Sequence, residues 1–222
     1  MTNRFGLAAL PLVAALWATP GLAADLTVDA PVAANEFYAT IFAGGAFTNL
    51  DLQQTGPGPD DDGVTELTFE TAPMIGAALG VSVTEDLRAE VELSYTTALI
   101  AEWDGFSLPG ETSGYEVSLF GNLWYDFDTG SAITPYLGAG LGISYRETSH
   151  PAGGLEVAGL AYQVGAGVRV DVADNVALDL GYRLRVRPDT DITVDGDAPP
   201  PGYEAWASSL THVVQVGVSF GF

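Results

Sequence analysis

Arginine and carboxylate residues that recur at every second position are the residues of this chain best placed to do chemistry. Arg88, Glu90 and Glu92 follow this spacing, as do Arg183 and Arg185. Because alternate side chains of a β-strand point to the same face, each such run lies on one face of a strand. A guanidinium group binds a carboxylate through two parallel hydrogen bonds, so the spacing predicts a network of ion pairs. The predicted network contains Arg88, Glu90, Glu92, Glu116, Arg169, Asp171, Asp179, Arg183 and Arg185.

Acidic residues between the apolar segments form a second group of candidates. Asp189, Asp191, Asp195 and Asp197 lie close together near the C-terminal end of the chain. Carboxylate oxygens are good ligands for Ca²⁺, but this spacing is not that of an EF-hand loop. We therefore expect solvated loops whose charges repel one another, and no metal site. The alternative is divalent-cation binding that links these loops to anionic lipid headgroups.

The composition excludes several classes of function. The 222 residues include 29 acidic residues and seven basic ones, all of which are arginine. The formal net charge of -22 argues against nucleic-acid binding, which needs basic patches. The absence of Cys excludes disulfides, thiol catalysis and cysteine-bound zinc. A hydrophobic content of 47% with only 16% charged residues points instead to contact with lipid.

The N-terminal segment has the features of a secretory signal peptide. Arg4 precedes an apolar run over 5–18, and small residues stand at Gly21 and Ala23. The run is shorter than the roughly 20 residues that a transmembrane helix needs, although an uncleaved anchor is the alternative. The predicted organisation is a signal peptide at 1–23, a flexible lead-in at 24–35 and a transmembrane β-barrel domain at 36–222.

Alternation of apolar and polar residues decides the predicted architecture. One face of each alternating segment is free of charge, whereas the other faces carry the predicted network together with Glu70, Asp126 and Arg146. Most segments have 9 to 16 residues, enough to cross a bilayer as strands. Because a sheet in lipid must close on itself, the pattern predicts an all-β, eight-stranded antiparallel up-and-down transmembrane β-barrel with the charges in its lumen. The expected strands are 37–48, 67–83, 87–96, 115–126, 133–146, 160–172, 176–185 and 210–222.

Connection lengths predict the orientation of this barrel. Short turns at 84–86, 127–132 and 173–175 alternate with longer connections, as periplasmic turns and external loops do in outer-membrane barrels. The expected loops are 51–66, 97–113, 147–159 and 186–208. Aromatic side chains prefer the two membrane interfaces. We expect Phe37, Tyr125, Phe220 and Phe222 at the periplasmic rim, and Phe47, Tyr95, Tyr115 and Tyr145 at the outer rim.

Pairing across the tight turns predicts how the lumen is filled. The expected opposite pairs are Arg169–Asp179, Arg183–Gly165, Arg185–Gln163, Glu90–Gly80 and Glu92–Ala78. Small residues opposite long ones leave room for the long side chains. Because the interior of an eight-stranded barrel is just wide enough for side chains to fill, we expect a plugged lumen; a continuous water channel is the alternative. Arg187 falls in an expected loop, so we expect the other five arginines after Arg4 to lie inside.

Four segments carry a resemblance to a known family. They are 134–142 (Thr-Pro-Tyr-Leu-Gly-Ala-Gly-Leu-Gly), 161–167 (Ala-Tyr-Gln-Val-Gly-Ala-Gly), 178–183 (Leu-Asp-Leu-Gly-Tyr-Arg) and a C-terminal pattern of Gln215, Gly217, Phe220 and Phe222. The mature chain resembles the small outer-membrane β-barrels of Gram-negative bacteria, the porin-like group related to the OmpA membrane domain. The last pattern resembles the signal by which the barrel-assembly machinery recognises its substrates.

This resemblance implies a location and a set of partners. The protein is expected to be integral to the cell outer membrane, in contact with its lipid and lipopolysaccharide, and to meet periplasmic chaperones and the barrel-assembly machinery during biogenesis. Because the sequence ends at Phe222, the peptidoglycan-binding domain of full OmpA-type proteins is not expected.

The histidines do not complete a catalytic site. Some barrels of this kind are lipid A deacylases that use a lipid-facing His with a Ser two residues on. His212 has the lipid-facing position, but Val214 stands where the Ser is needed, and His150 lies in an acidic segment. We therefore expect no enzyme activity and no cofactor.

The function that the sequence predicts is a structural, porin-like one, with acidic loops at the cell surface. The alternatives are a loop-mediated adhesin or ligand-binding surface protein, and a narrow solute channel. Conductance in planar bilayers separates the channel from the other two.

Overall fold

The computed structural model describes residues 37–55, 63–69, 71–97, 100–103, 106–107, 113–150, 153–194 and 204–222. The predicted signal peptide at 1–23 and the lead-in at 24–35 lie outside the described residues, so the structure does not test them. The described part consists of β-strands joined by short turns. No helix long and apolar enough to cross a membrane occurs within these ranges.

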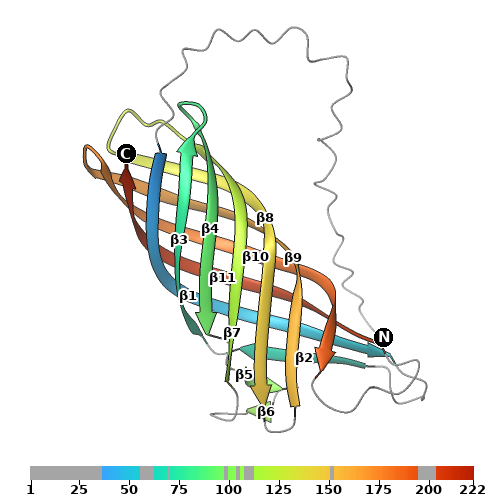
Figure 1. Ribbon diagram of the computed structural model, residues 1–222. Coiled ribbons are helices and arrows are strands. Elements are labelled where there is room, and N and C mark those ends of the chain that lie inside the picture. Colours follow the sequence, from blue (N-terminus) through green and yellow to red (C-terminus); the bar gives the residue numbers. More distant parts are fainter. Residues whose placement is uncertain are drawn as a thin grey trace, which may run out of the picture. The chain divides into compact units, whose positions relative to one another are not determined.

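Eleven strands make up the described fold. They are β1 (Phe37–Thr55), β2 (Gly63–Phe69), β3 (Ala72–Ser82), β4 (Leu87–Thr97), β5 (Ile100–Trp103), β6 (Phe106–Ser107), β7 (Ser113–Asp126), β8 (Ile133–His150), β9 (Gly153–Ala173), β10 (Val176–Val194) and β11 (Glu204–Gly221). Neighbouring strands pair in the order β11-β10-β9-β8-β7-β4-β3-β1, and β11 pairs again with β1 (Figure 1). This last pairing closes the sheet into a barrel.

The eleven strands occupy eight positions around the barrel wall. We call each position, whether it holds one strand or two successive ones, a stave. β1 pairs with β3 along 37–46 and with β2 along 49–54, so β2 and β3 are successive parts of one stave. β4 and β5 form the next stave in the same way, because β3 pairs with β4 and β2 pairs with β5. The short β6 pairs back on β5. All these pairings are antiparallel, which confirms the predicted eight-stranded antiparallel fold.

The three tight connections also agree with the prediction. β3 and β4 are joined through 83–86, β7 and β8 through 127–132, and β9 and β10 through 174–175. In the longest of these turns Gly130 has a φ of +65°, a left-handed conformation that glycine adopts without steric cost. The side chain of Asp128 accepts a hydrogen bond of 2.7 Å from the N–H of Gly130 and so stabilises the turn. We call this end of the barrel the turn side and the other the loop side.

The strands on the loop side are longer than the alternation predicts. β8 reaches His150 and β9 begins at Gly153, whereas 147–159 is expected to be a loop. β1 likewise runs to Thr55 and β10 to Val194. The predicted extents of these loops are therefore wrong. Lipid imposes an apolar face only within the membrane; beyond it both faces meet water, so the alternation ends while backbone pairing continues.

The second stave, formed by β2 and β3, changes phase although the apolar alternation from Leu67 to Val83 is continuous in the sequence. Ala46 pairs with Ala72 and Asn49 with Thr68, so the second stave has one residue more than β1 between these pairs. This extra residue is a β-bulge, and it moves Phe69 to the lumen, where it is only 6% exposed. Because Glu70 is predicted to face the lumen, its neighbour Phe69 is expected on the lipid face. This expectation is wrong, because one inserted residue exchanges the two faces of a strand.

The outward face of the barrel is an uninterrupted apolar band. Leu141 and Leu160 are each 73% exposed, and every stave contributes further large apolar residues that are exposed on this face. The others include Ile41, Ile75, Leu79, Val91, Leu93, Leu119, Leu123, Leu137, Ile143, Val164, Leu178, Leu180, Val214 and Val216. Monomeric soluble proteins rarely expose apolar patches of more than a few hundred Å². An apolar band around the whole barrel wall is therefore suited to contact with the hydrocarbon chains of lipids and not with water.

Aromatic side chains border this band at both ends, as predicted. Phe37 and Phe222 stack on the turn side with their ring centroids 6.4 Å apart. On the loop side, the ring of Tyr115 lies 6.0 Å from that of Tyr95 and 6.1 Å from that of Tyr145. The hydroxyls of Tyr115 and Tyr145 both donate to Glu147, an outward-facing carboxylate that the prediction assigns to a loop.

Candidate functional site

The lumen holds the arginines of the described part of the chain. Arg88, Arg146, Arg183, Arg185 and Arg187 are buried, and Arg169 is half-buried. Arg187 is the residue that the prediction misses. Because β10 continues to Val194, Arg187 follows Arg183 and Arg185 on the same face of one strand, and it points inward instead of standing in an external loop.

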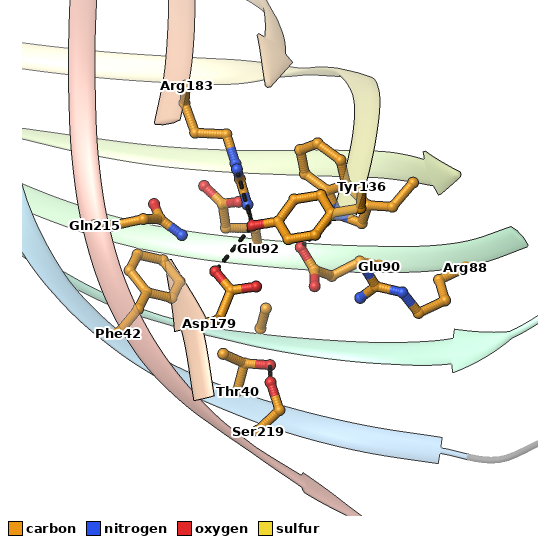
Figure 2. Close-up of a pocket in the computed structure, with 12 residues that line it drawn as sticks. Thr40, Phe42, Arg88, Glu90, Glu92, Tyr136, Asp179, Arg183, Gln215 and Ser219 are labelled. Carbon is orange, nitrogen blue, oxygen red and sulfur yellow. Dashed lines mark hydrogen bonds between the residues drawn. The ribbon is translucent and has the colours of Figure 1, made fainter. Parts of the chain in front are cut away.

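Six charged residues form the turn-side cluster: Arg88, Glu90, Asp126, Arg169, Asp179 and Arg183. Its strongest pair joins Arg88 to Asp126, with Nε–Oδ2 at 2.5 Å and Nη2–Oδ1 at 2.8 Å. Arg88 also donates to the hydroxyl of Tyr38 at 3.0 Å, and this hydroxyl donates to Glu90 at 3.0 Å. The neighbouring hydroxyl of Tyr136, on β8, contacts two side chains of β10: it donates to Asp179 at 2.9 Å and accepts from Arg183 at 3.4 Å (Figure 2).

Aromatic rings support the guanidinium groups of this cluster. The Arg183 guanidinium carbon lies 4.1 Å from the centroid of the Trp124 ring, and that of Arg169 lies 5.0 Å from the Tyr38 ring. A cation over an aromatic face is attracted by the ring quadrupole, most strongly where water is excluded. The indole N–H of Trp124 meanwhile donates to Glu90 at 3.1 Å. The turn-side cluster therefore contains three arginines and three carboxylates, with Tyr38, Trp124 and Tyr136 packed among them.

A central layer closes the middle of the lumen. It is formed by Glu92, Asn122, Gln163 and Arg185, which come from four strands. Arg185 donates to Glu92 at 2.6 Å and to Gln163 at 3.1 Å, and Gln163 donates to Asn122 at 2.7 Å. An apolar cluster fills the opposite side of the barrel at Phe42, Ala46, Met74, Ala78 and Val213. Buried side chains from β1, β3, β4, β7, β9, β10 and β11 thus lie at the middle of the lumen.

A third group, the loop-side cluster, consists of Glu116, Arg146 and Arg187. Arg146 contacts the Glu116 oxygen Oε2 through Nη2 at 2.5 Å and Nε at 2.8 Å. Arg187 donates to the same oxygen at 2.9 Å. The guanidinium of Arg146 also lies 4.4 Å from the centroid of the Phe69 ring, which the β-bulge carries inward. Of these residues, only Glu116 belongs to the predicted network.

The strand register explains how so many long side chains fit. The five predicted opposite pairs are confirmed, including Arg169–Asp179 and Glu90–Gly80. A Cβ atom on Gly80 would overlap the Tyr38 ring, and one on Gly138 would overlap Trp124 and the carbonyl oxygen of Leu123. Glycines on the lumen face therefore provide the space that the aromatic and charged residues occupy.

A substitution at Gly138 tests this requirement for space. We expect Gly138→Ala to lower the free energy of unfolding by about 1–3 kcal/mol, the usual cost of overpacking a closed interior. Gly121→Ala is the matched control on the lipid face, because the nearest atom to its added Cβ would lie 3.9 Å away. Urea titration of both variants in detergent micelles measures the difference. Equal stabilities would contradict the close packing at Gly138.

The remaining candidates are placed as follows. Asp171 is exposed and not part of the buried network, because it lies near the turn-side mouth of the lumen, two residues from the end of β9. Asp126 pairs with Arg88 and Arg146 with Glu116, although the predicted network names neither. In the C-terminal pattern, Gln215 is buried, Gly217 is half-buried, and Phe220 and Phe222 point outward.

The acidic residues considered for metal binding are largely untested. Asp189 is exposed, whereas the side chain of Asp191 and all of Asp195 and Asp197 lie outside the description. Within the described ranges, no group of three or more His, Asp or Glu residues is arranged to hold a metal ion. His212 faces outward, and its Nδ1 lies 2.7 Å from the hydroxyl of Tyr182. The side chain of His150 is not described.

Together, the closed eight-stranded wall, the apolar band and the filled lumen define an integral outer-membrane β-barrel. The family described as "Outer membrane protein beta-barrel domain" matches residues 13–222, and the chain belongs to this family. No curated protein matches the sequence.

Solved structures give the same fold. Neisserial surface protein A (NspA) has 22% sequence identity and a TM-score of 0.52, covering 84% of this chain and 97% of its own. The outer-membrane protein AlkL, determined in lipid bilayers, has 15% identity and a TM-score of 0.60, covering 85% of this chain and 90% of its own. The outer-membrane protease OmpT from Escherichia coli has 12% identity and a TM-score of 0.53, covering 84% of this chain and 97% of its own. At these identities the likeness concerns the fold alone.

Proposed function

We propose that the protein is a structural barrel of the outer membrane of a Gram-negative bacterium, with a lumen that does not conduct solutes and acidic loops at the cell surface. The observation that carries this proposal is the central layer. Glu92 and Gln163 are each only 1% exposed, and the layer they form separates two small cavities of about 20 Å³ and about 10 Å³. A cavity needs about 10–15 Å³ to hold one water molecule, so neither cavity has room for a solute. No enzymatic activity is part of this proposal.

Planar-bilayer conductance tests the closed lumen. The wild-type barrel is expected to give no discrete conductance steps under conditions in which a trimeric porin gives them. The double variant Glu92→Ala/Arg185→Ala removes both partners of the central ion pair, and we expect it to admit ions. Heat-modifiable migration in electrophoresis verifies that both proteins are folded. Discrete steps from the wild type would overturn the proposal in favour of a narrow channel.

Export and assembly complete the proposed role. We infer that a signal peptide at 1–23 directs the chain to the periplasm and that the C-terminal pattern ending in Phe222 presents it to the barrel-assembly machinery. Support comes from the geometry of the end: the N–H of Phe222 donates to the carbonyl of Phe37 at 2.9 Å, where β11 meets β1 and the barrel closes. Chaperones and lipopolysaccharide are the remaining partners proposed.

Deletion of Phe222 is expected to slow assembly. The deletion removes an exposed aromatic side chain and the last hydrogen bond at the closing seam, while every other pairing of β11 is kept. We expect a lower fraction of heat-modifiable barrel at early times after expression in cells. Phe47→Leu, which changes an outward aromatic residue on the loop side, serves as the control. An unchanged yield over time would count against the role of the terminal residue.

A second candidate function is loop-mediated binding at the cell surface, favoured by the distribution of charge. The six described arginines lie in the lumen, whereas many of the 29 acidic residues, including Glu147 and Asp189, lie outside it. The outer surface therefore favours cationic partners or divalent cations. Exchanging the loops between this barrel and NspA, then measuring binding to host-cell surfaces, tests an adhesin role. Calcium titration by calorimetry against a loop-deleted protein tests the cation alternative, and equal heats would remove it.

A further inference from the structure

The loop-side cluster differs from the rest of the lumen in its balance of charge. In the turn-side cluster, three arginines face three carboxylates, and in the central layer Arg185 is paired with Glu92. In the loop-side cluster, Arg146 and Arg187 share one carboxylate, Glu116, and even one oxygen of it. Since guanidinium groups stay protonated in proteins, the described side chains of this cluster carry one positive charge in excess.

The same cluster holds most of the buried polar atoms that lack a partner within the protein. The described lumen contains eight such atoms, and five of them lie here. They are Nη1 of Arg146, Nε and Nη1 of Arg187, and the hydroxyls of Ser144 and Thr148. Arginine nitrogens can only donate, and both hydroxyls have a hydrogen to donate, so all five atoms are donors for which the described residues supply no acceptor. Two of these residues, Ser144 and Arg187, line the same cavity.

Apolar and central-layer side chains enclose the cluster on both sides. Arg146 and Arg187 are each only 3% exposed. Leu50, Val157 and Phe69 are buried near its loop-side end, and Phe120 and Gln163 are buried on the side of the central layer. An uncompensated charge in such an environment costs several kcal/mol, and unsatisfied donors add to that cost. A neutral water molecule would satisfy donors but would leave the charge.

The space available limits the size of the compensating group. A cavity of about 10 Å³ is lined by Ser144, Arg187, Glu116 and Arg185, among others. This is space for one small particle and not for a polyatomic anion such as phosphate, sulfate or a carboxylate. We propose that the loop-side cluster binds a single monatomic anion, of which chloride is the natural example, through the free N–H groups of Arg187 and the hydroxyl of Ser144.

Crystallography with bromide tests the site directly. Crystals of the folded barrel grown or soaked in sodium bromide are expected to show an anomalous peak beside Arg187 and Ser144. A peak without anomalous signal at that position identifies a water molecule and overturns the proposal. Bromide found only at the outer surface overturns it as well.

Stability in solution gives an independent test. A ligand that binds only the folded state raises stability as its concentration rises. At constant ionic strength, replacing sodium gluconate with sodium chloride is expected to raise the unfolding midpoint of the wild type in detergent. Arg187→Gln removes the excess charge and is expected to abolish this dependence. Arg169→Gln, in the turn-side cluster, is the matched control and should keep it.

Ser144→Ala removes one free hydroxyl that lines the cavity, so it provides a second variant if Arg187→Gln does not fold. We expect it to weaken the apparent affinity for chloride several-fold. Equal midpoints in chloride and gluconate for the wild type would overturn the proposal. The same chloride dependence in wild type, Arg187→Gln and Ser144→Ala would do so too.

Discussion

Glu92→Ala is expected to lower the free energy of unfolding by about 3–5 kcal/mol, because removing one partner of a buried ion pair leaves the other charge uncompensated. Glu92 is 1% exposed and accepts from Arg185 at 2.6 Å and from Asn122 at 3.2 Å. Without the carboxylate, Arg185 keeps its charge in the middle of the lumen and loses its shortest hydrogen bond. Urea titration of the folded barrel, followed by tryptophan fluorescence, measures the change.

Two further variants separate charge from shape at this position. Glu92→Gln retains the size and one acceptor oxygen, so its cost reports on the charge alone. The double variant Glu92→Ala/Arg185→Ala removes both charges and is expected to cost less than Glu92→Ala and Arg185→Ala added together, because neither charge is left unpaired. Asp171→Asn serves as the control for a lumen-side carboxylate that is exposed, and its effect is expected to be near zero. Similar losses for Asp171→Asn and Glu92→Ala would contradict the buried network.

Leu180→Arg is expected to lower the free energy of unfolding by about 2–4 kcal/mol in a lipid bilayer, the cost of an arginine facing lipid near the midplane. Leu180 is exposed on the outer face and pairs with Val216. On β11, Val216 lies midway between Phe220 at the turn-side rim and His212 near the loop-side rim. The position is therefore close to the middle of the apolar band. Folding titrations in phospholipid vesicles give the measurement.

Depth provides the control for this second prediction. Leu210→Arg places the same charge on the same face but near the loop-side end of the band, where the cost in a bilayer falls to about 0–1 kcal/mol. A dependence on depth distinguishes lipid exposure from a general loss of packing. Equal costs at Leu180 and Leu210, or no cost at either, would contradict the assignment of the outward face to lipid.

The β-bulge near Phe69 marks the limit of what alternation can predict. Every stave is recognised from its period-2 pattern, and most strands keep the predicted phase. The apolar pattern from Leu67 to Val83 reads as one continuous strand, yet the pairing with β1 requires one extra residue. The pattern on a single strand cannot reveal this insertion, because a bulge is defined by the partner strand. That pairing directs the Phe69 side chain into the lumen, where it contacts Arg146.

The alternation does not place Arg187 in the lumen, for a different reason. Its position on the same face as Arg183 and Arg185 is implicit in the alternation, but the lipid-facing signal that defines a strand stops just before it. β10 continues because its backbone pairs with β9 and β11 in water as well as in lipid. A rule that extends each strand until a turn residue appears, instead of until the apolar face ends, would have placed Arg187 in the lumen.

By itself, the sequence determined the number of staves, the lipid-facing side of each stave except beyond the β-bulge at Phe69, and the register across the tight turns. These properties depend on residues that are two positions apart or that flank a short turn, so local order is enough to specify them. Only the tertiary structure decided which charges meet: Arg88 with Asp126, Arg185 with Glu92, and Arg146 and Arg187 on one oxygen of Glu116. Those partners are 30 to 93 residues apart in the chain, and what brings them together is the closure of the wall around a lumen only a few side chains wide.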